Sequence, residues 1–191
     1  MTEEDVTREA LAVLSAASIL PRLVVLDLDY TLWPFYWKKV DSQIVIQIWI
    51  DLGTQTNTNH ECCTKRDSPY LYPQAKGILN ALKEKEVKLA VASRTPTPDI
   101  AQVFLTKLGL TDFFVDMEIF PSWTHKTEHL ENIHQKTKIP FSSVIFFDDE
   151  DRNIQSVSRM GVTSVLVHDG VDIRALQKGL TDFAISKHRT T

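Results

Sequence analysis

The chain has 191 residues, of which 43% are hydrophobic and 24% charged, which suits one globular domain with a substantial core. Its 21 basic and 25 acidic side chains give a net charge of -4, which argues against nucleic acid as a partner and leaves small anions open. No run approaches the roughly 18 apolar residues of a membrane span, so no membrane association is expected.

The compartment is predicted from the N-terminus and the cysteines. The first 20 residues lack the basic start of a secretory signal and the Arg-rich composition of a transit peptide. Cys62 and Cys63 are adjacent, a spacing that disfavours a structural disulfide, and no zinc-ligand spacing accompanies them. We therefore expect a cytoplasmic protein with free thiols.

Strand and helix patterns alternate along the chain. Helical periodicity over 3–19 predicts a helical extension within residues 1–21. Apolar runs predict strands over 22–28, 87–93, 142–148 and 163–169, with a weaker candidate over 113–120. Amphipathic patterns predict helices over 73–85, 97–108, 124–136, 150–159 and 171–186. This order predicts an α/β fold, Rossmann-like and doubly wound, with a mostly parallel sheet, helices on both faces and no large cap domain.

Residues 38–68 depart from this alternation. They hold an apolar patch, "SQIVIQIWI", that suits a strand as well as a helix, followed by a polar Thr, Asn and Gln tract. We interpret 38–68 as an atypical insertion between the first strand and its crossover helix. The domain proper then covers 22–186, and 187–191 form a tail.

Polar residues gather where the predicted strands end. In parallel α/β sheets, ligands bind beyond the carboxyl ends of the strands. The residues found there are Asp27, Asp29 and Thr31, then Ser93, Arg94 and Thr95, then Ser122, His125 and Lys126, and finally Asp148, Asp149, Glu150 and Asp151. Acids from two strands, a hydroxyl from a third and a lysine together suit the handling of phosphate.

The chemistry follows from the charges. Converging carboxylates raise one another's pKa, and a hard divalent cation such as Mg²⁺ relieves the repulsion while also binding phosphate oxygens. Asp27, at the strand end, can then attack a phosphoryl group and form an aspartyl-phosphate. Asp29, two residues on, can protonate the leaving oxygen and later activate water. A serine and a lysine can hold the phosphoryl oxygens.

The motifs "DLDYTLWPF", "ASRT" and "FFDDEDRNI" resemble those of the haloacid dehalogenase (HAD) superfamily, and within it the magnesium-dependent phosphatases. The resemblance covers 22–37 and 70–186. It implies that Asp27 is the nucleophile and a metal ligand, and that Asp29 is the general acid/base and binds metal through its backbone carbonyl. It implies Asp149 as the third acidic ligand, with Asp148 supporting it or ligating instead.

The same resemblance implies a substrate-binding set. It comprises Leu28, Thr31, Tyr36, Ser93, Arg94 and Lys126, with Tyr36 in the pocket wall. The assignment of Lys126 rests on the histidine that follows it, His129. The implied activity is Mg²⁺-dependent hydrolysis of phosphate monoesters on small molecules or phosphoproteins. Relatives act on phosphotyrosine and on sugar phosphates such as fructosamine-6-phosphate, and both substrate classes stay open.

Other interpretations stand beside this one. A phosphate-accepting receiver-type domain also uses a parallel sheet, clustered acids and Mg²⁺, although it places its acid pair differently. A HAD-like interaction protein whose activity is impaired by an insertion over 38–60 is a second alternative.

Trp33 and Phe35 suit the core as well as the pocket. His125, His129 and His134 show no zinc spacing and are expected at the surface or as capping groups.

Overall fold

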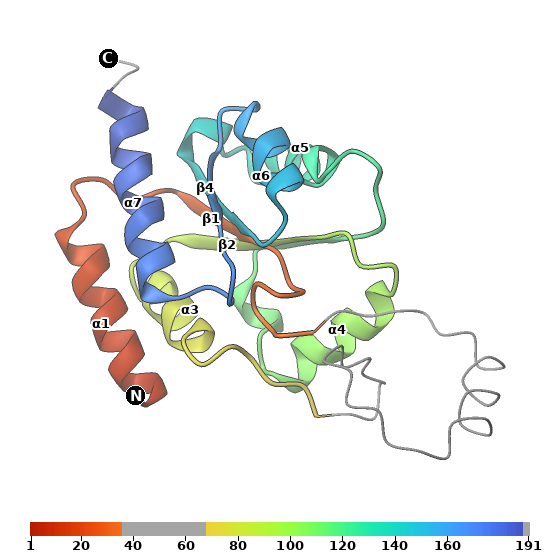
Figure 1. Cartoon of the computed structure of the whole chain (residues 1–191), viewed down its shortest axis with the longest axis horizontal. Helices are drawn as coiled ribbons and strands as arrows, with labels where there is room; N and C mark the ends of the chain where they lie inside the picture. Colours follow the sequence, from red (N-terminus) through yellow and green to blue (C-terminus); the bar gives the residue numbers. More distant parts are fainter. Residues whose placement is uncertain (36–67, 189–191) are drawn as a thin grey trace, which may run out of the picture.

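The computed structural model describes residues 1–35 and 68–188, which form one parallel sheet with helices on both faces (Figure 1). The sheet has five strands in the order β3-β2-β1-β4-β5. Their bounds are β1 Leu23–Leu26, β2 Lys88–Ser93, β3 Asp116–Ile119, β4 Val144–Asp148 and β5 Thr163–Leu166. The helices are α1 Glu3–Ala16, α3 Ala75–Glu84, α4 Pro98–Lys107, α5 Thr127–Thr137, α6 Asp151–Ser158 and α7 Ile173–His188. The predicted fold class is confirmed.

The central strand β1 shows why both faces are covered. All four of its residues are buried. Val24 and Leu26 point into the larger core beneath α1, α3, α4 and α7, while Leu23 and Val25 point into the smaller core beneath α5 and α6. Because side chains alternate across a strand, a fully apolar strand requires a helical layer on each face.

Helix α1 packs onto the outside of one helical layer. Thr2 and Asp5 form a capping box at its start, and it buries Val6, Ala10 and Leu14. It lies against α3, where a Cβ on Gly77 would come within 2.7 Å of the Val6 side chain. The glycine therefore permits this close approach. The N-terminal helix contributes to the core, although it ends at Ala16 rather than at the predicted residue 19.

Several elements are shorter than their sequence patterns. The strand predicted over 142–148 begins at Val144 because residues Phe141–Ser143 form a 3₁₀ turn, and the weaker candidate over 113–120 is the edge strand β3. The helix predicted over 124–136 begins at Thr127 because His125 and Lys126 have left-handed backbone angles, with φ of 49° and 68°. The insertion at 38–68 lies, except for Ser68, outside the described residues, as do Tyr36, Cys62 and Cys63.

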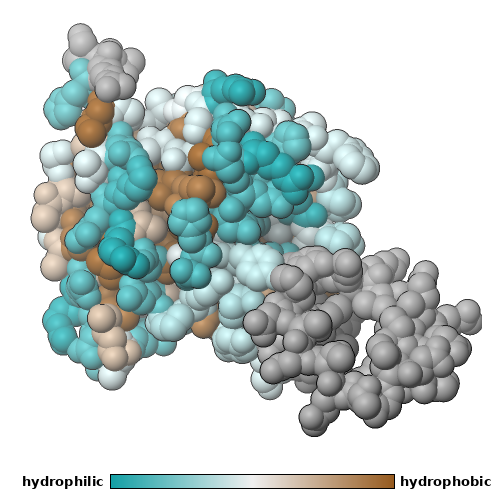
Figure 2. Space-filling model, viewed as in Figure 1, coloured by the Kyte–Doolittle hydropathy of each residue, from teal (hydrophilic) through white to brown (hydrophobic). Residues whose placement is uncertain are grey.

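Figure 2 shows hydrophobic side chains among polar ones on the face formed by α1 and α7. A groove between these helices is lined by residues including Val13, Ala16, Leu180 and Ile185. Among the described helices, none is both long enough and apolar enough to cross a membrane.

Candidate active site

The first acid of the site continues the central strand. The Asp27 amide donates to the Phe147 carbonyl at 3.0 Å, so the ladder between β1 and β4 extends one residue past β1. This hydrogen bond fixes Asp27 at the carboxyl edge of the sheet, where its side chain is buried. Of the polar residues predicted here, it lies most centrally, between the ends of β2 and β4.

The chain then turns sharply, which separates Asp29 from the strand. The Leu28 carbonyl accepts hydrogen bonds from the amides of Thr31, Leu32 and Trp33, and Tyr30 adopts a left-handed φ of 53°. The Asp29 carboxylate accepts a hydrogen bond from the Trp33 indole at 2.7 Å. Trp33 is fully buried and stacks on Phe35, so both aromatics are core residues. A core side chain thus orients the second aspartate.

Lys126 reaches the site from the start of α5. Its ammonium lies 2.6 Å from Asp27 Oδ1 and also pairs with Asp148. The Lys126 side chain is 2% exposed. His125 and Lys126 both have left-handed backbone angles, and this turn directs the side chain toward the edge of the sheet. Burying an ammonium requires compensation by opposite charge, which the two carboxylates provide.

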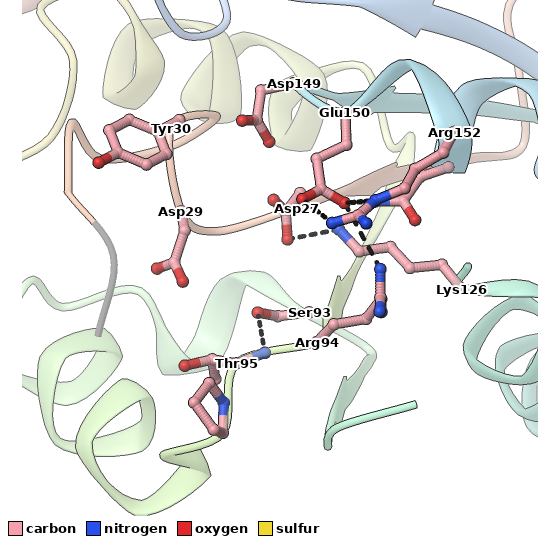
Figure 3. A pocket seen from close by; sticks show the side chains of 12 residues that line it. Asp27, Asp29, Tyr30, Ser93, Arg94, Thr95, Lys126, Asp149, Glu150 and Arg152 are labelled. Atoms are coloured by element: carbon pink, nitrogen blue, oxygen red, sulfur yellow. Dashed lines mark hydrogen bonds and ion pairs between the residues drawn. The ribbon is translucent and has the colours of Figure 1, made fainter. Parts of the chain in front are cut away.

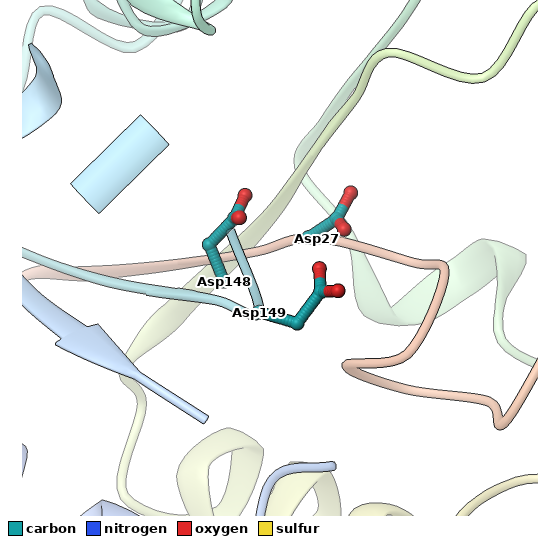
Figure 4. Close-up of side chains that lie close together, drawn as sticks. All are labelled: Asp27, Asp148 and Asp149. Carbon is teal, nitrogen blue, oxygen red and sulfur yellow. The ribbon is translucent and has the colours of Figure 1, made fainter. Parts of the chain in front are cut away.

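The acids after β4 divide into an anchored one and an accessible one (Figure 4). The Asp148 carboxylate accepts hydrogen bonds from the Glu150 amide at 2.8 Å and from the Asn153 side chain at 3.0 Å, besides its pair with Lys126. Asp149 lines the cavity instead. One oxygen from each of Asp27, Asp148 and Asp149 lies within 4.8 Å of the others.

Burial, and after it the crowding of carboxylates, raises the pKa of the acids in the site. Burial raises the pKa of Asp27 well above its usual value, Lys126 opposes the shift, and Asp148 adds to it. Burial raises the pKa of Asp29 to about 7 against the effect of the Trp33 hydrogen bond. Burial and then the neighbouring Asp148 charge raise the pKa of Asp149 to about 6. A bound cation would lower all three by offsetting this negative charge.

A cavity of about 380 Å³ opens over these groups (Figure 3). Of the predicted site residues, it is lined by Asp27, Asp29, Ser93, Arg94, Lys126 and Asp149. Leu28 and Thr31 do not line it: both are fully buried, Leu28 in the hydrophobic core, and the Thr31 carbonyl accepts from the Val171 amide at 2.9 Å. Tyr36 lies outside the described residues.

His129 contradicts the expectation of a surface or capping histidine. It is completely buried, and its ring stacks on Phe120 with centroids 3.9 Å apart. Its Nε2 lies 3.0 Å from the Ser93 carbonyl and 2.9 Å from the Phe120 carbonyl, so it carries the proton and donates to both. Helical periodicity alone did not indicate this contact, because it depends on where the ends of β2 and β3 lie.

Three further residues border the site without a role assigned from the sequence. Asn153 donates to the carboxylates of both Asp148 and Glu150, and Glu150 and Arg152 line the cavity. All three belong to the run "DDEDRN". The available signal was the spacing: Asn153 comes five residues after Asp148, which lets the first turn of α6 fold back onto the strand end.

The donor set fits a magnesium ion. Mg²⁺ prefers oxygen ligands and binds through one or two carboxylates together with water and phosphate oxygens. The three clustered aspartates supply oxygen donors, and no histidine or cysteine belongs to this group among the described residues. The lysine balances only part of the charge on the cluster.

The parallel sheet with acids clustered at its carboxyl edge defines an α/β fold that is shared with solved structures of HAD-superfamily proteins. Solved structures with the same fold include a HAD-superfamily hydrolase from Ehrlichia chaffeensis (TM-score 0.62, 16% identity, covering 87% of this chain and 100% of that one). Another is a predicted phosphoglycolate phosphatase from Haemophilus somnus (TM-score 0.56, 18% identity, covering 91% and 100%).

Sequence comparison narrows the class to a family. The family model described as Acid Phosphatase matches residues 19–186, and the chain belongs to this acid phosphatase family. It is 40% identical over 166 residues to human magnesium-dependent phosphatase 1, covering 86% of this chain and 88% of the relative. It is 33% identical over 162 residues to a HAD-like hydrolase superfamily protein of Schizosaccharomyces pombe, covering 75% and 83%. The family predicted from the motifs is confirmed.

Proposed function

We propose that this protein is a Mg²⁺-dependent phosphatase that hydrolyses phosphate monoesters through an aspartyl-phosphate on Asp27. The observation that carries the proposal is the meeting of three aspartates within 4.8 Å at one sheet edge, with Lys126 paired to two of them. The name of the human relative, a magnesium-dependent phosphatase, supports both the activity and the metal.

Each side chain then has a role that its position supports. Asp27 attacks phosphorus in line with the leaving oxygen, and Ser93 and Lys126 donate hydrogen bonds to the phosphoryl oxygens. Asp29, with a pKa raised to about 7, protonates the leaving oxygen and then takes a proton from the attacking water. Asp27, the Asp29 carbonyl and Asp149 would hold Mg²⁺, and Asp148 supports them through Lys126 and Asn153.

When bound, Mg²⁺ supplies charge that lets a carboxylate approach a phosphate dianion. The chain itself supplies the positions of nucleophile and proton donor. The proposed substrates are phosphate esters of phosphotyrosine type or sugar phosphates, because both present a phosphoryl group to the Asp27, Ser93 and Lys126 side chains that line the cavity.

The proposal is tested by turnover of p-nitrophenyl phosphate with Mg²⁺, with EDTA, and by the Asp27→Asn variant. We expect turnover only with the metal, and a loss of at least about a thousandfold in Asp27→Asn because the amide cannot act as nucleophile. Equal rates for wild type and Asp27→Asn would contradict the proposal. Circular dichroism of the variant would control for folding.

A further inference from the structure

Two arginines border the cavity on the side away from Asp29 (Figure 3). Arg94 directly follows Ser93 at the end of β2, and Arg152 lies in the first turn of α6. The family resemblance groups Arg94 with the phosphate ligands. Arg94 lines the cavity, and its hydrogen bonds among the described residues are with Ser122 and Glu150.

Arg94 is held in a fixed position. Its Nε donates to the Ser122 carbonyl at 2.8 Å, and its Nη1 lies 3.5 Å from Glu150 Oε2. The side chain is only 22% exposed. A guanidinium anchored through its Nε atom keeps its outer N–H groups directed beyond the anchor, so Arg94 presents a pre-positioned cation at the rim.

Glu150 lies between the two arginines. Arg152 donates to it from Nε at 2.9 Å and from Nη2 at 2.6 Å, and Asn153 donates at 3.0 Å. The Arg152 side chain is 59% exposed, so its guanidinium can reorient toward a ligand. Within the group of Arg94, Glu150 and Arg152, two guanidinium groups therefore share one carboxylate partner.

We propose that Arg94, Glu150 and Arg152 form a second anion subsite beside the reacting phosphate. Resting on the proposed function, it would select phosphate monoesters whose leaving group carries another anionic group, either a carboxylate or a second phosphate. Each guanidinium has five N–H groups. Arg94 uses two of them, on Ser122 and Glu150, and Arg152 uses two on Glu150, so both keep N–H groups that can bind such an anion.

The experiment compares kcat/KM for substrates that differ only in the second anion. One pair is N-acetyl-phosphotyrosine and its methyl amide, which tests a carboxylate. The other pair is a sugar bisphosphate and the matching monophosphate, which tests a second phosphate. We expect wild type to prefer the anionic member of at least one pair by about tenfold. Added salt should reduce this preference because Arg152 is largely exposed.

Variants of the two arginines test whether the preference for the anionic substrate depends on the subsite. Arg152→Gln and Arg94→Gln should each bring the ratio within a pair close to one. Arg174→Gln is the matched control, since Arg174 also pairs with an acid two residues earlier, Asp172, but lies on α7 outside this cavity. It should keep the wild-type ratio. If Arg94→Gln fails to fold, the kcat/KM ratio of Arg152→Gln, at the more exposed position, tests the subsite by itself.

The outcomes are distinct. Equal kcat/KM within both pairs for wild type, or a preference unchanged in Arg152→Gln, would overturn the subsite while turnover of p-nitrophenyl phosphate upholds the phosphatase. Absence of any turnover by wild type would overturn the proposed function and the subsite with it.

Discussion

Lys126 and His129 show how single residues of α5 shape the site. The Lys126 ammonium pairs with two buried carboxylates and offsets part of their charge, and this pairing makes burial of these charged groups tolerable. One helical turn later, His129 donates hydrogen bonds to the Ser93 and Phe120 carbonyls, at the ends of β2 and β3. The first of these carbonyls belongs to Ser93, so the histidine holds the proposed phosphate-binding hydroxyl in relation to the lysine.

Replacing His129 tests this link. His129→Leu removes the side-chain donor to the Phe120 carbonyl and one of two donors to the Ser93 carbonyl, which also accepts from the Phe120 amide at 3.1 Å. The loss should cost about 1–3 kcal/mol of stability. It should also lower kcat per folded enzyme, because the Ser93 carbonyl then keeps only the Phe120 amide as a donor and the position of Ser93 relative to Lys126 is less well fixed. His129→Gln, whose amide can donate to the same carbonyls, should recover part of kcat. Denaturant unfolding and steady-state kinetics measure the two effects.

The matched control is His134→Gln on the same helix, where the ring nitrogen donates to the Ile139 carbonyl at 2.7 Å, away from the cavity. It should leave kcat near wild type. A loss of kcat in His134→Gln as large as in His129→Leu would mean that α5 acts through general stability and not through Ser93.

At the level of elements, the edge strand β3 depends on α5 for its charge balance. Glu118 is buried on β3, and it accepts hydrogen bonds from Asn132 at 2.9 Å and from Lys136, both on α5. Lys136 also lies 3.0 Å from Asp116. Burial opposes ionisation of Glu118, but these donors outweigh it and lower its pKa. The charge of the acids on this strand is thus partly balanced by tertiary contacts from α5.

This pairing predicts a pH-dependent part of stability. Because the folded-state pKa of Glu118 lies below its unfolded value, the stabilisation is complete above the unfolded pKa and is lost as pH falls through the folded pKa. Glu118→Gln should therefore cost about 1 kcal/mol at about pH 7, discounted for the exposed lysine, and much less at about pH 3. Urea unfolding at both pH values measures the difference. A cost that is equal at both pH values would contradict the ion-pair account.

The same elements show what could be predicted from the sequence. The strands that are buried on both faces, such as β1 and β4, were predictable because continuous apolar runs signal them, and so were the acids that follow them. β3 gave a weak signal because its acids depend on partners from α5. The burial of His129 was missed because its contacts join α5 to the ends of β2 and β3, which helical periodicity does not indicate. The anchoring of Asp148 by Asn153 is local, five residues along the chain, and its signal was that spacing alone.

At the scale of the whole molecule, the strand order places the site. β1 lies at the centre of the sheet with β2 and β4 on either side, so Asp27, Ser93 and the acids after β4 meet at one edge. The two helical layers cover the faces and leave that edge accessible. Residues that are far apart in the chain, Asp27 and Asp148, therefore share one lysine.

Metal binding should consequently stabilise the whole fold. A cation that binds the folded chain alone at about 100 times its Kd adds about 2.7 kcal/mol, or a Tm increase of several degrees. We expect Mg²⁺ to raise Tm of wild type and not of Asp149→Asn, measured by calorimetry with and without EDTA. Asp182→Asn, which removes an exposed acid on α7, is the control and should keep the shift. An equal shift in Asp149→Asn would place the metal elsewhere.

The central claim is that Asp27 carries the phosphoryl group during turnover. The most direct measurement is mass spectrometry of enzyme quenched with acid during hydrolysis of a phosphate monoester in Mg²⁺. We expect the mass of one phosphoryl group on the peptide that contains Asp27, and its absence from Asp27→Asn. A phosphoryl group on another residue, or turnover with none on Asp27 under conditions that trap acyl phosphates, would contradict it.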